Sequence, residues 1–511
     1  MNTISWMPPW VEHAWTRLVE VRPVADPLYR LPGPAPHWSC RQPTTAGWGE
    51  ITQGLQKAGE RLRALPIRDI VESLGAVGER FRPRSSPDRQ LAVEAMCATT
   101  GLSAETVHRS LDIEMDSCRP SELWAALERD LGDPLVLDGY RGNAQLRGCT
   151  RAIGPRLVAV VATGNVPGLA WLPIARALLA KAPVVLKVAR GEPEFASLFV
   201  ERLHRLAPVL AEAVVATYWE PGDSGAFNGA FERADCVVVY GGEKAVEAIR
   251  RYLRPTQRVM VHGHKFSGGV LTRAYLAREG AERVAELFAS DIGAFDQHAC
   301  IAPKVLVVEG ECSEVDAFAE VLQAALAQYA ADCLPGRMCP QDAASLSARR
   351  LTARWKEAAG TGRVWHGSEL GWTVERSFEL PPLDCGGDRY IVLVPAPNPL
   401  ACVERLRERS AHLQNVVVGA VPEEMPMLAE EAALLGACRV CPPGSGASPS
   451  MIWRHDGRAC LAEFIRWCDV EGWADWERWP AHEMPGSRAT AQSDRVTTAG
   501  SLQWRKFEES E

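Results

Sequence analysis

The sequence predicts an α/β fold in which two parallel-sheet domains follow one another. Short runs of β-branched residues alternate with helical patterns from about residue 150 to 262, and a second series of this kind follows residue 300. Strands that alternate with helices at this spacing form right-handed βαβ units and a parallel sheet. The chain has 511 residues, which is enough for two or three domains.

The two segments before the first expected strand, residues 1–50 and 51–130, differ in composition and in hydrophobic periodicity. Residues 1–50 are rich in Pro and Trp and lack periodicity, so we expect an irregular N-terminal arm. Residues 51–130 are expected to be helical, because apolar side chains recur on one helical face, as they do in 67–74. We expect this helical part and the first sheet to form one domain over residues 51–262, of the kind that binds a dinucleotide.

The first series supplies five expected strands. They lie at 156–163, 183–188, 213–219, 235–240 and 258–263. Parallel sheets of this kind bind ligands at the carboxyl ends of their strands. Functional residues are therefore sought where these runs end.

The second series is expected to form a separate α/β domain over 263–445. Its strands are expected at 303–309, 389–394 and 415–421. The pattern between 333 and 388 is weak, and we interpret it as a long insertion. We expect residues 446–511 to pack back on the first domain or on a partner subunit.

Composition excludes several classes of protein. The net charge of −8 disfavours a nucleic-acid surface, which requires a basic stripe. The most apolar stretch, 166–180, is broken by Pro173 and Arg176 and is too short to span a bilayer. Fifteen cysteines without an export signal indicate reduced thiols. We therefore expect a cytoplasmic protein without a membrane span, in which a cysteine is available as a nucleophile or a ligand.

Two short motifs lie where the first two strands end. The loop TGNVPG (163–168) joins a strand to a helix, and the amide of Asn165 could donate to a developing oxyanion. The loop is equally compatible with a simple turn. Lys187 and Arg190 lie at the end of the second strand, where a dinucleotide fold meets the adenosine ribose. The alternative for both is a solvated cation at a strand end.

Cys300 lies between small residues just before an expected strand, in DIGAFDQHACIAPK (291–304). A cysteine in this position is a nucleophile if its pKa is lowered. The alternative is one more buried thiol among fifteen. His298, two residues earlier, is a candidate to tune that thiol, and it is equally compatible with an ordinary hydrogen-bonded imidazole.

Three other motifs are interpreted as structural. GDSGA (222–226) resembles a serine-protease segment but sits within a βαβ series, so Ser224 is expected in a loop. CRVC (438–441) lacks a second pair of ligands and is expected to be a strand. GSGASP (444–449) lacks the strand and helix of a dinucleotide fingerprint. No metal site is expected.

Several motifs together resemble a known family. TGNVPG, VVLKVAR, VVVYGGEKAVEAIR, HGHKFSGGV and DQHACIAP occur in the order expected of the aldehyde dehydrogenase superfamily. GNVPG, GHKFS, DQHAC and the late HDGRACLAEFIRW (455–467) look like the acyl-CoA reductase family, which includes the fatty acyl reductase of bacterial bioluminescence. The resemblance covers about residues 135–470. It implies an aldehyde-dehydrogenase-like fold with a Rossmann-type cofactor domain and a catalytic domain that carries a nucleophilic cysteine.

The resemblance assigns roles to individual positions. Cys300 matches the nucleophile and Asn165 the oxyanion-hole asparagine. Lys187 matches the lysine at the adenosine ribose, and Gly241 and Gly242 match the loop near the pyrophosphate. Two histidines, His298 and His264, are further candidates for tuning the thiol or contacting the substrate.

Two departures from the superfamily pattern refine the expectation. Oxidising members carry a water-activating glutamate four residues before a lysine that matches Lys265, and here that position is Val261. NAD-selective members often carry an acidic residue where this chain has Arg190, whose guanidinium would pair with a 2′-phosphate. The first departure favours thioester reduction, and the second favours NADPH.

The resemblance therefore implies NADPH-dependent reduction of an acyl thioester to an aldehyde through an acyl-enzyme on Cys300. NADH is the alternative cofactor, and acyl-CoA and acyl carrier protein are the alternative donors. We expect a homo-oligomer, with an acyl-transferring partner subunit as an open question. The alternatives are an aldehyde dehydrogenase that forms a free acid and an idle subunit that binds cofactor or acyl carrier.

Overall fold

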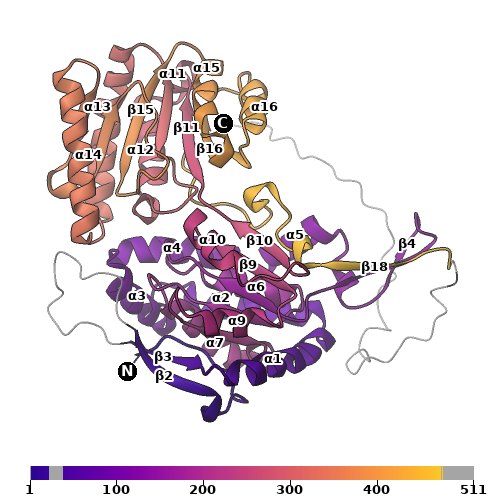
Figure 1. Ribbon diagram of the computed structural model, residues 1–511. Coiled ribbons are helices and arrows are strands. Elements are labelled where there is room, and N and C mark those ends of the chain that lie inside the picture. Colours follow the sequence, from indigo (N-terminus) through magenta and orange to yellow (C-terminus); the bar gives the residue numbers. More distant parts are fainter. Residues whose placement is uncertain (1, 22–37, 474, 476–511) are drawn as a thin grey trace.

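The computed structural model describes residues 2–21, 38–473 and 475. Two lobes, each built on a parallel sheet, lie one above the other in Figure 1. The α/β class predicted from the sequence is confirmed.

The first lobe contains a five-stranded sheet in the order β10-β9-β6-β7-β8, with every neighbouring pair parallel. Its strands are β6 (Val158–Val161), β7 (Val184–Lys187), β8 (Val214–Thr217), β9 (Cys236–Tyr240) and β10 (Arg258–His262). Most of their side chains are buried, which is why they are rich in Val. All five expected strands are present.

Helices cover both faces of this sheet. On one face lie α2 (Ile67–Phe81), α6 (Trp171–Leu179) and α7 (Glu194–Leu206). On the other lie α1 (Gly47–Ala64) and α9 (Ser224–Phe231), while α10 (Glu243–Arg250) follows β9. The region expected to be helical also contains α3 (Pro87–Thr100), α4 (Ala104–Ser117) and α5 (Pro120–Leu131). Because all five strands are parallel, their carboxyl ends meet at one edge, which faces the second lobe.

The second lobe contains a seven-stranded sheet in the order β13-β14-β15-β12-β11-β16-β17, parallel except for the pair β13 and β14. Its central strands are β11 (Phe266–Leu271), β12 (Val305–Glu309), β15 (Tyr390–Ala396) and β16 (Leu413–Gly419), with β17 (Arg439–Cys441) at one edge. Helices α12 (Ala281–Gly293) and α13 (Cys312–Asp332) pack on one face, and α15 (Pro399–Glu404) and α16 (Met425–Leu434) pack on the other.

Two segments are more regular than the sequence predicts. Residues 333–388, interpreted as an insertion, form α14 (Pro340–Ala358) and the strands β13 (Arg363–His366) and β14 (Thr373–Arg376), which complete one edge of the sheet. Most of α14 is exposed, so its apolar periodicity is weak. The expectation of an irregular arm over residues 1–50 is also wrong for its described part. That part forms β1 (Asn2–Thr3), β2 (Thr16–Val21) and β3 (Trp38–Pro43), and Trp6 pairs with Ala216 at the edge of β8.

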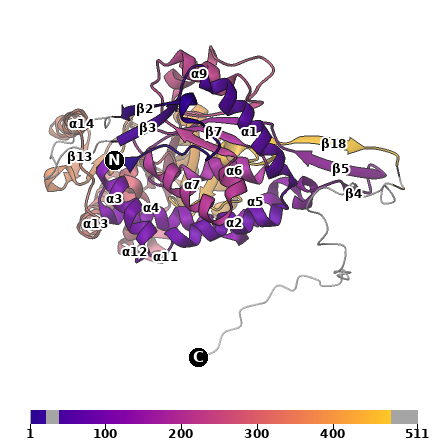
Figure 2. The same cartoon turned by 90° about the horizontal axis from the view of Figure 1, so that it is seen from below.

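A small antiparallel sheet projects from the first lobe, as Figure 2 shows. It joins β4 (Arg141–Asn143) and β5 (Gly148–Ile153) to β18 (Arg466–Val470) from the end of the described chain. Residues 455–470 thus lie against the first lobe, while most of the segment after residue 473 lies outside the described residues. Within the described part, no helix is long and apolar enough to cross a membrane.

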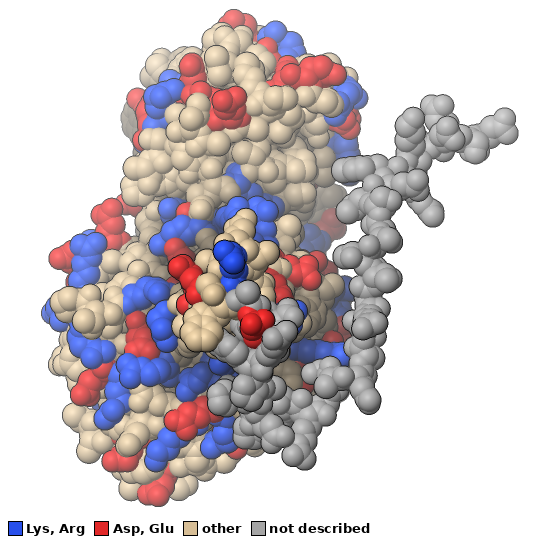
Figure 3. All heavy atoms as spheres, turned by 90° about the vertical axis from the view of Figure 1, so that its right-hand side faces the viewer, with Lys and Arg blue, Asp and Glu red and all other residues tan. Residues whose placement is uncertain are grey.

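Charges of both signs are interspersed on the face in Figure 3, over the upper and the lower lobe alike. On this face the charges do not form the continuous basic stripe that a nucleic-acid surface requires.

Candidate active site

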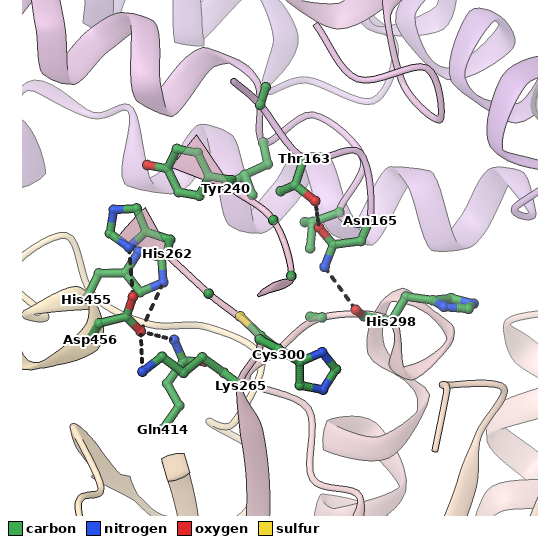
Figure 4. A pocket seen from close by; sticks show the side chains of 18 of the residues that line it. Thr163, Asn165, Tyr240, His262, Lys265, His298, Cys300, Gln414, His455 and Asp456 are labelled. Carbon is green, nitrogen blue, oxygen red and sulfur yellow. Dashed lines mark hydrogen bonds and ion pairs between the residues drawn. The ribbon is translucent and has the colours of Figure 1, made fainter. Parts of the chain in front are cut away.

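A cavity of about 420 Å³ lies between the lobes, at the carboxyl edge of the first sheet. Its walls come from the loops after β6, β9 and β10, from residues 298–304 before β12, and from residues 383–387. Figure 4 shows Cys300 near the middle of this wall, with Asn165 on one side and a group of polar side chains on the other. The topology therefore brings chain segments from both lobes to one site.

The loop that carries Cys300 is held in an unusual conformation. Phe295, Asp296 and Gln297 have φ values of 54°, 49° and 65°, in the left-handed region that side-chain-bearing residues seldom adopt. Such conformations persist only where the surroundings fix them, and they concentrate at functional sites. The strained turn therefore marks the segment just before Cys300 as a constrained one.

Buried hydrogen bonds fix this turn. The Asp296 carboxylate accepts a hydrogen bond of 2.6 Å from Arg389. The Gln297 amide donates to the carbonyls of Pro303 and Tyr390 at 2.7 and 2.9 Å and accepts from the Tyr390 backbone N–H at 2.8 Å. These contacts tie the loop to β15, so the position of the Cys300 backbone is set by the second sheet.

The Cys300 thiol is only partly exposed, and it is protonated at rest. Burial raises its pKa to about 11, and the nearby Asp456 carboxylate contributes to the rise. Lys304 and the Gln414 side chain act in the opposite direction. A thiol of this pKa requires a base, or the substrate itself, before it becomes a strong nucleophile.

Asn165 faces the same loop with a fixed amide. The Thr163 hydroxyl donates to Asn165 Oδ1 at 2.7 Å, and Asn165 Nδ2 donates to the His298 carbonyl at 3.0 Å. Thr163 thereby sets which end of the amide faces the Cys300 segment. Because an amide NH₂ has two donor hydrogens, one remains for a substrate oxygen.

The two candidate histidines both line the cavity but differ in orientation. The imidazole of His298 points away from the Cys300 sulfur in Figure 4, and its Nε2 lies 3.5 Å from the Asp388 carboxylate. The ring of His264 lies 3.0 Å from the Leu383 carbonyl. His298 therefore reaches the site through its carbonyl group, which positions Asn165.

The nucleotide-binding candidates divide into two groups. Gly241 and Gly242 line the cavity and precede α10, and a Cβ built at Gly242 would meet no atom within 4 Å. Lys187 and Arg190 do not line the cavity; they lie at and beyond the end of β7. Lys187 Nζ lies 4.8 Å from the Tyr218 ring centre, and burial lowers the pKa of this lysine to about 8.

Val261 packs against the hydrophobic cluster beneath the first sheet and is not among the cavity-lining residues. Its neighbour His262, which points to the opposite side of β10, lines the cavity instead. The carboxylates in the described wall come from Asp384 and Asp456, in other segments of the chain.

The polar side chains beyond Cys300 were not predicted from the sequence. His262, His455, Asp456, Gln414 and Lys265 form one connected network in this wall. Two of them lie within the late HDG motif and one in the GHKFS motif, which served only as marks of resemblance. Their roles could not be found from sequence, because the network joins three segments that are distant in the chain.

Comparison with known proteins supports both the fold and the resemblance. The long-chain acyl-protein thioester reductase of Aliivibrio fischeri is 25% identical over 331 residues, which cover 62% of this chain and 66% of that protein. The protein of the same description from Photorhabdus luminescens is 25% identical over 252 residues, which cover 48% of this chain and 51% of that protein. The chain thus matches between half and two thirds of the length of these relatives.

The fold is that of the aldehyde dehydrogenases. The crystal structure of an aldehyde dehydrogenase from Brucella melitensis biovar abortus 2308 superimposes with a TM-score of 0.66 at 12% identity, over 88% of this chain and 93% of that one. The family model for acyl-CoA reductase (LuxC) matches residues 62–467. Its motifs, its fold and this match place the chain in the acyl-CoA reductase (LuxC) family.

Proposed function

We propose that this protein reduces an acyl thioester to an aldehyde, with NADPH as reductant and with Cys300 as the covalent nucleophile. The observation that carries the proposal is the pairing of Cys300 with the fixed Asn165 amide in one cavity between the lobes. A nucleophile and an oxyanion donor at one carbonyl are the minimum set for acyl transfer.

In the proposed reaction the Cys300 sulfur attacks the thioester carbonyl. The free N–H of Asn165 stabilises the oxyanion that forms on the carbonyl oxygen, and the strained turn before Cys300 holds the sulfur in place. The carbon–sulfur bond of the thioester breaks, the thiol departs and the acyl group remains on Cys300. After reduction, the Asn165 amide again stabilises the alkoxide, whose collapse releases the aldehyde and frees Cys300.

The residues at the first sheet fit a nicotinamide dinucleotide, which would supply the hydride. Lys187 is a buried cation at a strand end that forms no ion pair within the described residues, so it is suited to a polar ligand such as a ribose. Gly242, which follows Gly241, leaves open space beside the first turn of α10, where backbone N–H groups favour phosphate. The preference for NADPH over NADH depends on Arg190, whose guanidinium suits a 2′-phosphate.

The acyl donor is proposed to be a pantetheine thioester. The relatives are described as acyl-protein thioester reductases, which adds an acyl-protein to acyl-CoA and acyl carrier protein as donors. A partner subunit that delivers the acyl group and a homo-oligomeric assembly are compatible with this proposal. A cytoplasmic location is part of the proposal, and the fifteen free cysteines are compatible with a reducing compartment.

The His262–Asp456 pair in the cavity favours a second candidate reaction, hydrolysis of the acyl-enzyme. Val261 provides no carboxylate, but His262 and Asp456 lie in the cavity and together could activate water. An acyl-enzyme attacked by water would yield a free acid, as in an oxidising aldehyde dehydrogenase. The nature of the product therefore separates the two reactions.

The test measures NADPH consumption by the purified protein with acyl-CoA thioesters of increasing chain length, with thiol, aldehyde and acid quantified. We expect one aldehyde and one thiol for each NADPH oxidised. If acyl-CoA fails, acyl carrier protein thioesters and NADH are tried in the same assay. Failure with all of these donors, or formation of free acid alone, would overturn the proposed function.

A further inference from the structure

The polar network beyond Cys300 is centred on one carboxylate. His262 Nδ1 lies 2.8 Å from Asp456 Oδ2, and Gln414 Nε2 donates to Asp456 Oδ1 at 2.8 Å. Lys265 Nζ and His455 Nε2 lie 3.7 and 3.9 Å from Oδ1. We call these five residues the Asp456 cluster; Figure 4 shows it on the opposite side of Cys300 from Asn165.

Burial, backbone conformation and stacked rings fix the position of the Asp456 side chain. Its side chain is only 5% exposed, and its backbone adopts a left-handed conformation with φ of 57°. Ring stacking also supports the cluster, since the His262 ring lies between the rings of Tyr240 and His455, with centroid distances of 4.5 and 4.4 Å. A strained backbone that presents a buried carboxylate to a cavity is more common at functional sites than elsewhere.

The charges of the cluster define its resting protonation. Burial alone would raise the pKa of Asp456, but the hydrogen bond from His262 and the neighbouring His455 and Lys265 side chains outweigh it and hold that pKa below its ordinary value. Burial lowers the pKa of His262, and burial together with His262 lowers the pKa of His455 to about 3. At neutral pH the carboxylate is therefore ionised and both imidazoles are neutral bases.

The orientation of His262 resembles that of the imidazole in a catalytic triad. A neutral ring whose Nδ1 faces a carboxylate carries its proton there, which leaves Nε2 as an acceptor. Nε2 of His262 makes no hydrogen bond to any of the described residues, and the ring lines the same cavity as Cys300. The His262–Asp456 pair thus offers a base with a free acceptor atom.

The cluster affects the pKa of Cys300 electrostatically. The negative charge of Asp456 raises the pKa of the thiol, while the Gln414 side chain, which hydrogen-bonds to Asp456, lowers it. Other groups act on the same sites. Among the described residues, the charged and titratable groups that face His262 or Cys300 include Asp456, His455, Tyr240, Lys265, Arg176, Arg458 and Lys304.

We infer that the Asp456 cluster is the proton-transfer group of this enzyme, with His262 as the base and Asp456 as the residue that positions it. The inference rests on the proposed function. As the Cys300 sulfur bonds to the acyl carbon, its proton moves to His262, so no free thiolate has to exist. The leaving thiolate then takes that proton and departs as a thiol, and the cluster returns to its resting charge.

The second half-reaction balances in the same way. Hydride addition to the acyl carbon is followed by cleavage of the bond between that carbon and the Cys300 sulfur. Cys300 leaves as a thiolate and is protonated through His262, which recovers a proton from solvent. Each turnover consumes one thioester, one NADPH and one proton, and yields one aldehyde, one thiol and one NADP⁺.

Three members of the cluster, His262, His455 and Asp456, could be considered as metal ligands, because their ligand atoms lie within 4.8 Å of one another. The surroundings argue against that role. Both Asp456 oxygens are already hydrogen-bonded, and Lys265 places a positive charge 3.7 Å from one of them. A divalent cation would have to displace those contacts and tolerate a lysine ammonium beside it.

The test compares Asp456→Asn, His262→Gln and His13→Asn with the wild type, and follows two measurements against pH. The first is the pre-steady-state rate of thiol release from acyl-CoA without NADPH. The second is the rate at which iodoacetamide alkylates Cys300, which reports the pKa of the thiol and requires no catalysis. His13→Asn is the matched control, because the His13 side chain is exposed and is not among the residues that line the cavity.

The two measurements should move in opposite directions in Asp456→Asn. Alkylation should shift to lower pH by roughly one unit, since a neighbouring negative charge is removed. Thiol release should nevertheless slow by about 10²–10⁴-fold, the usual contribution of a general base. In His262→Gln, thiol release should slow by a similar factor while the alkylation profile does not move to lower pH. His13→Asn should retain the wild-type pH profile in both measurements.

The inference fails if Asp456→Asn and His262→Gln release thiol at the wild-type rate with the wild-type pH profile, whereas wild-type production of aldehyde would still uphold the proposed function. It fails equally if a chelator abolishes wild-type thiol release and Zn²⁺ restores it, since a metal would then occupy the cluster. Should Asp456→Asn fold poorly by its circular dichroism spectrum and melting temperature, His262→Gln carries the test, because Gln414 and Lys265 still contact the carboxylate.

Discussion

Replacement of Asn165 by alanine tests the oxyanion site. The substitution removes the N–H that faces the thioester oxygen and keeps the cavity otherwise intact. Removal of a single oxyanion donor costs about 2.7–4 kcal/mol in the transition state, or 10²–10³-fold in rate. Because this hydrogen bond strengthens as charge develops, the loss should fall on kcat and leave KM largely unchanged.

The structure provides a graded series around this residue. Thr163→Val removes the hydroxyl that orients the Asn165 amide at 2.7 Å, but keeps the amide itself. We expect a loss of roughly fivefold, which corresponds to about 1 kcal/mol for one neutral hydrogen bond. Asn228→Ala, at an exposed position of α9, serves as the matched control and should retain the wild-type rate.

The assay is single-turnover release of coenzyme A from an acyl-CoA, followed by chromatography so that the protein's own thiols do not interfere. Loss of the hydrogen bond from Asn165 to the His298 carbonyl should also lower stability by about 1 kcal/mol, which melting temperatures will detect. Thiol release by Asn165→Ala within twofold of the wild type would refute the oxyanion role, as would an equal loss in Asn228→Ala.

Three further predictions concern the cofactor site and a buried acid. Lys187→Met should raise KM for NADPH by about 10-fold, with little change in kcat at saturation, because a charged hydrogen bond contributes about 1.5–3 kcal/mol. Arg190→Glu should reverse the cofactor preference, measured as the ratio of kcat/KM for NADPH and NADH; an unchanged ratio would remove Arg190 from the account. Burial raises the pKa of Glu192 to about 8, so the folded state binds more protons than the unfolded state and loses stability as pH rises from about 4.5 to 8. Glu192→Gln should therefore melt at a higher temperature than the wild type at pH 8 but not at pH 4.5, and equal differences at both pH values would contradict this reasoning.

The first sheet could be predicted from the sequence because most of its strands are buried on both faces and are rich in Val. β11 (Phe266–Leu271) is equally buried but was not predicted, since its sequence FSGGVL contains two glycines, which weaken a strand pattern. The structure explains them by crowding. A Cβ at Gly269 would come within 2.8 Å of the Leu306 side chain on the neighbouring strand.

Some residues of the candidate site could be predicted from the sequence, and others could not. Cys300, Asn165, His298 and His264 were selected because each sits in a local motif at a strand end, and the structure brings them to one cavity. Asp456 lacks such a local signal. It reaches the cavity because the chain returns from the second lobe to the first, and only the fold reveals that contact.

The most direct test of the central claim is to trap the acyl-enzyme. Wild-type protein and Cys300→Ala are incubated with an acyl-CoA in the absence of reductant, and the intact masses and proteolytic peptides are measured before and after addition of NADPH. We predict one acyl group on the Cys300 peptide of the wild type, none on the variant, and release of that group as aldehyde when NADPH is added. Acylation of another residue, an unmodified Cys300 in a protein that still forms aldehyde, or release of the acyl group only as free acid would contradict the account.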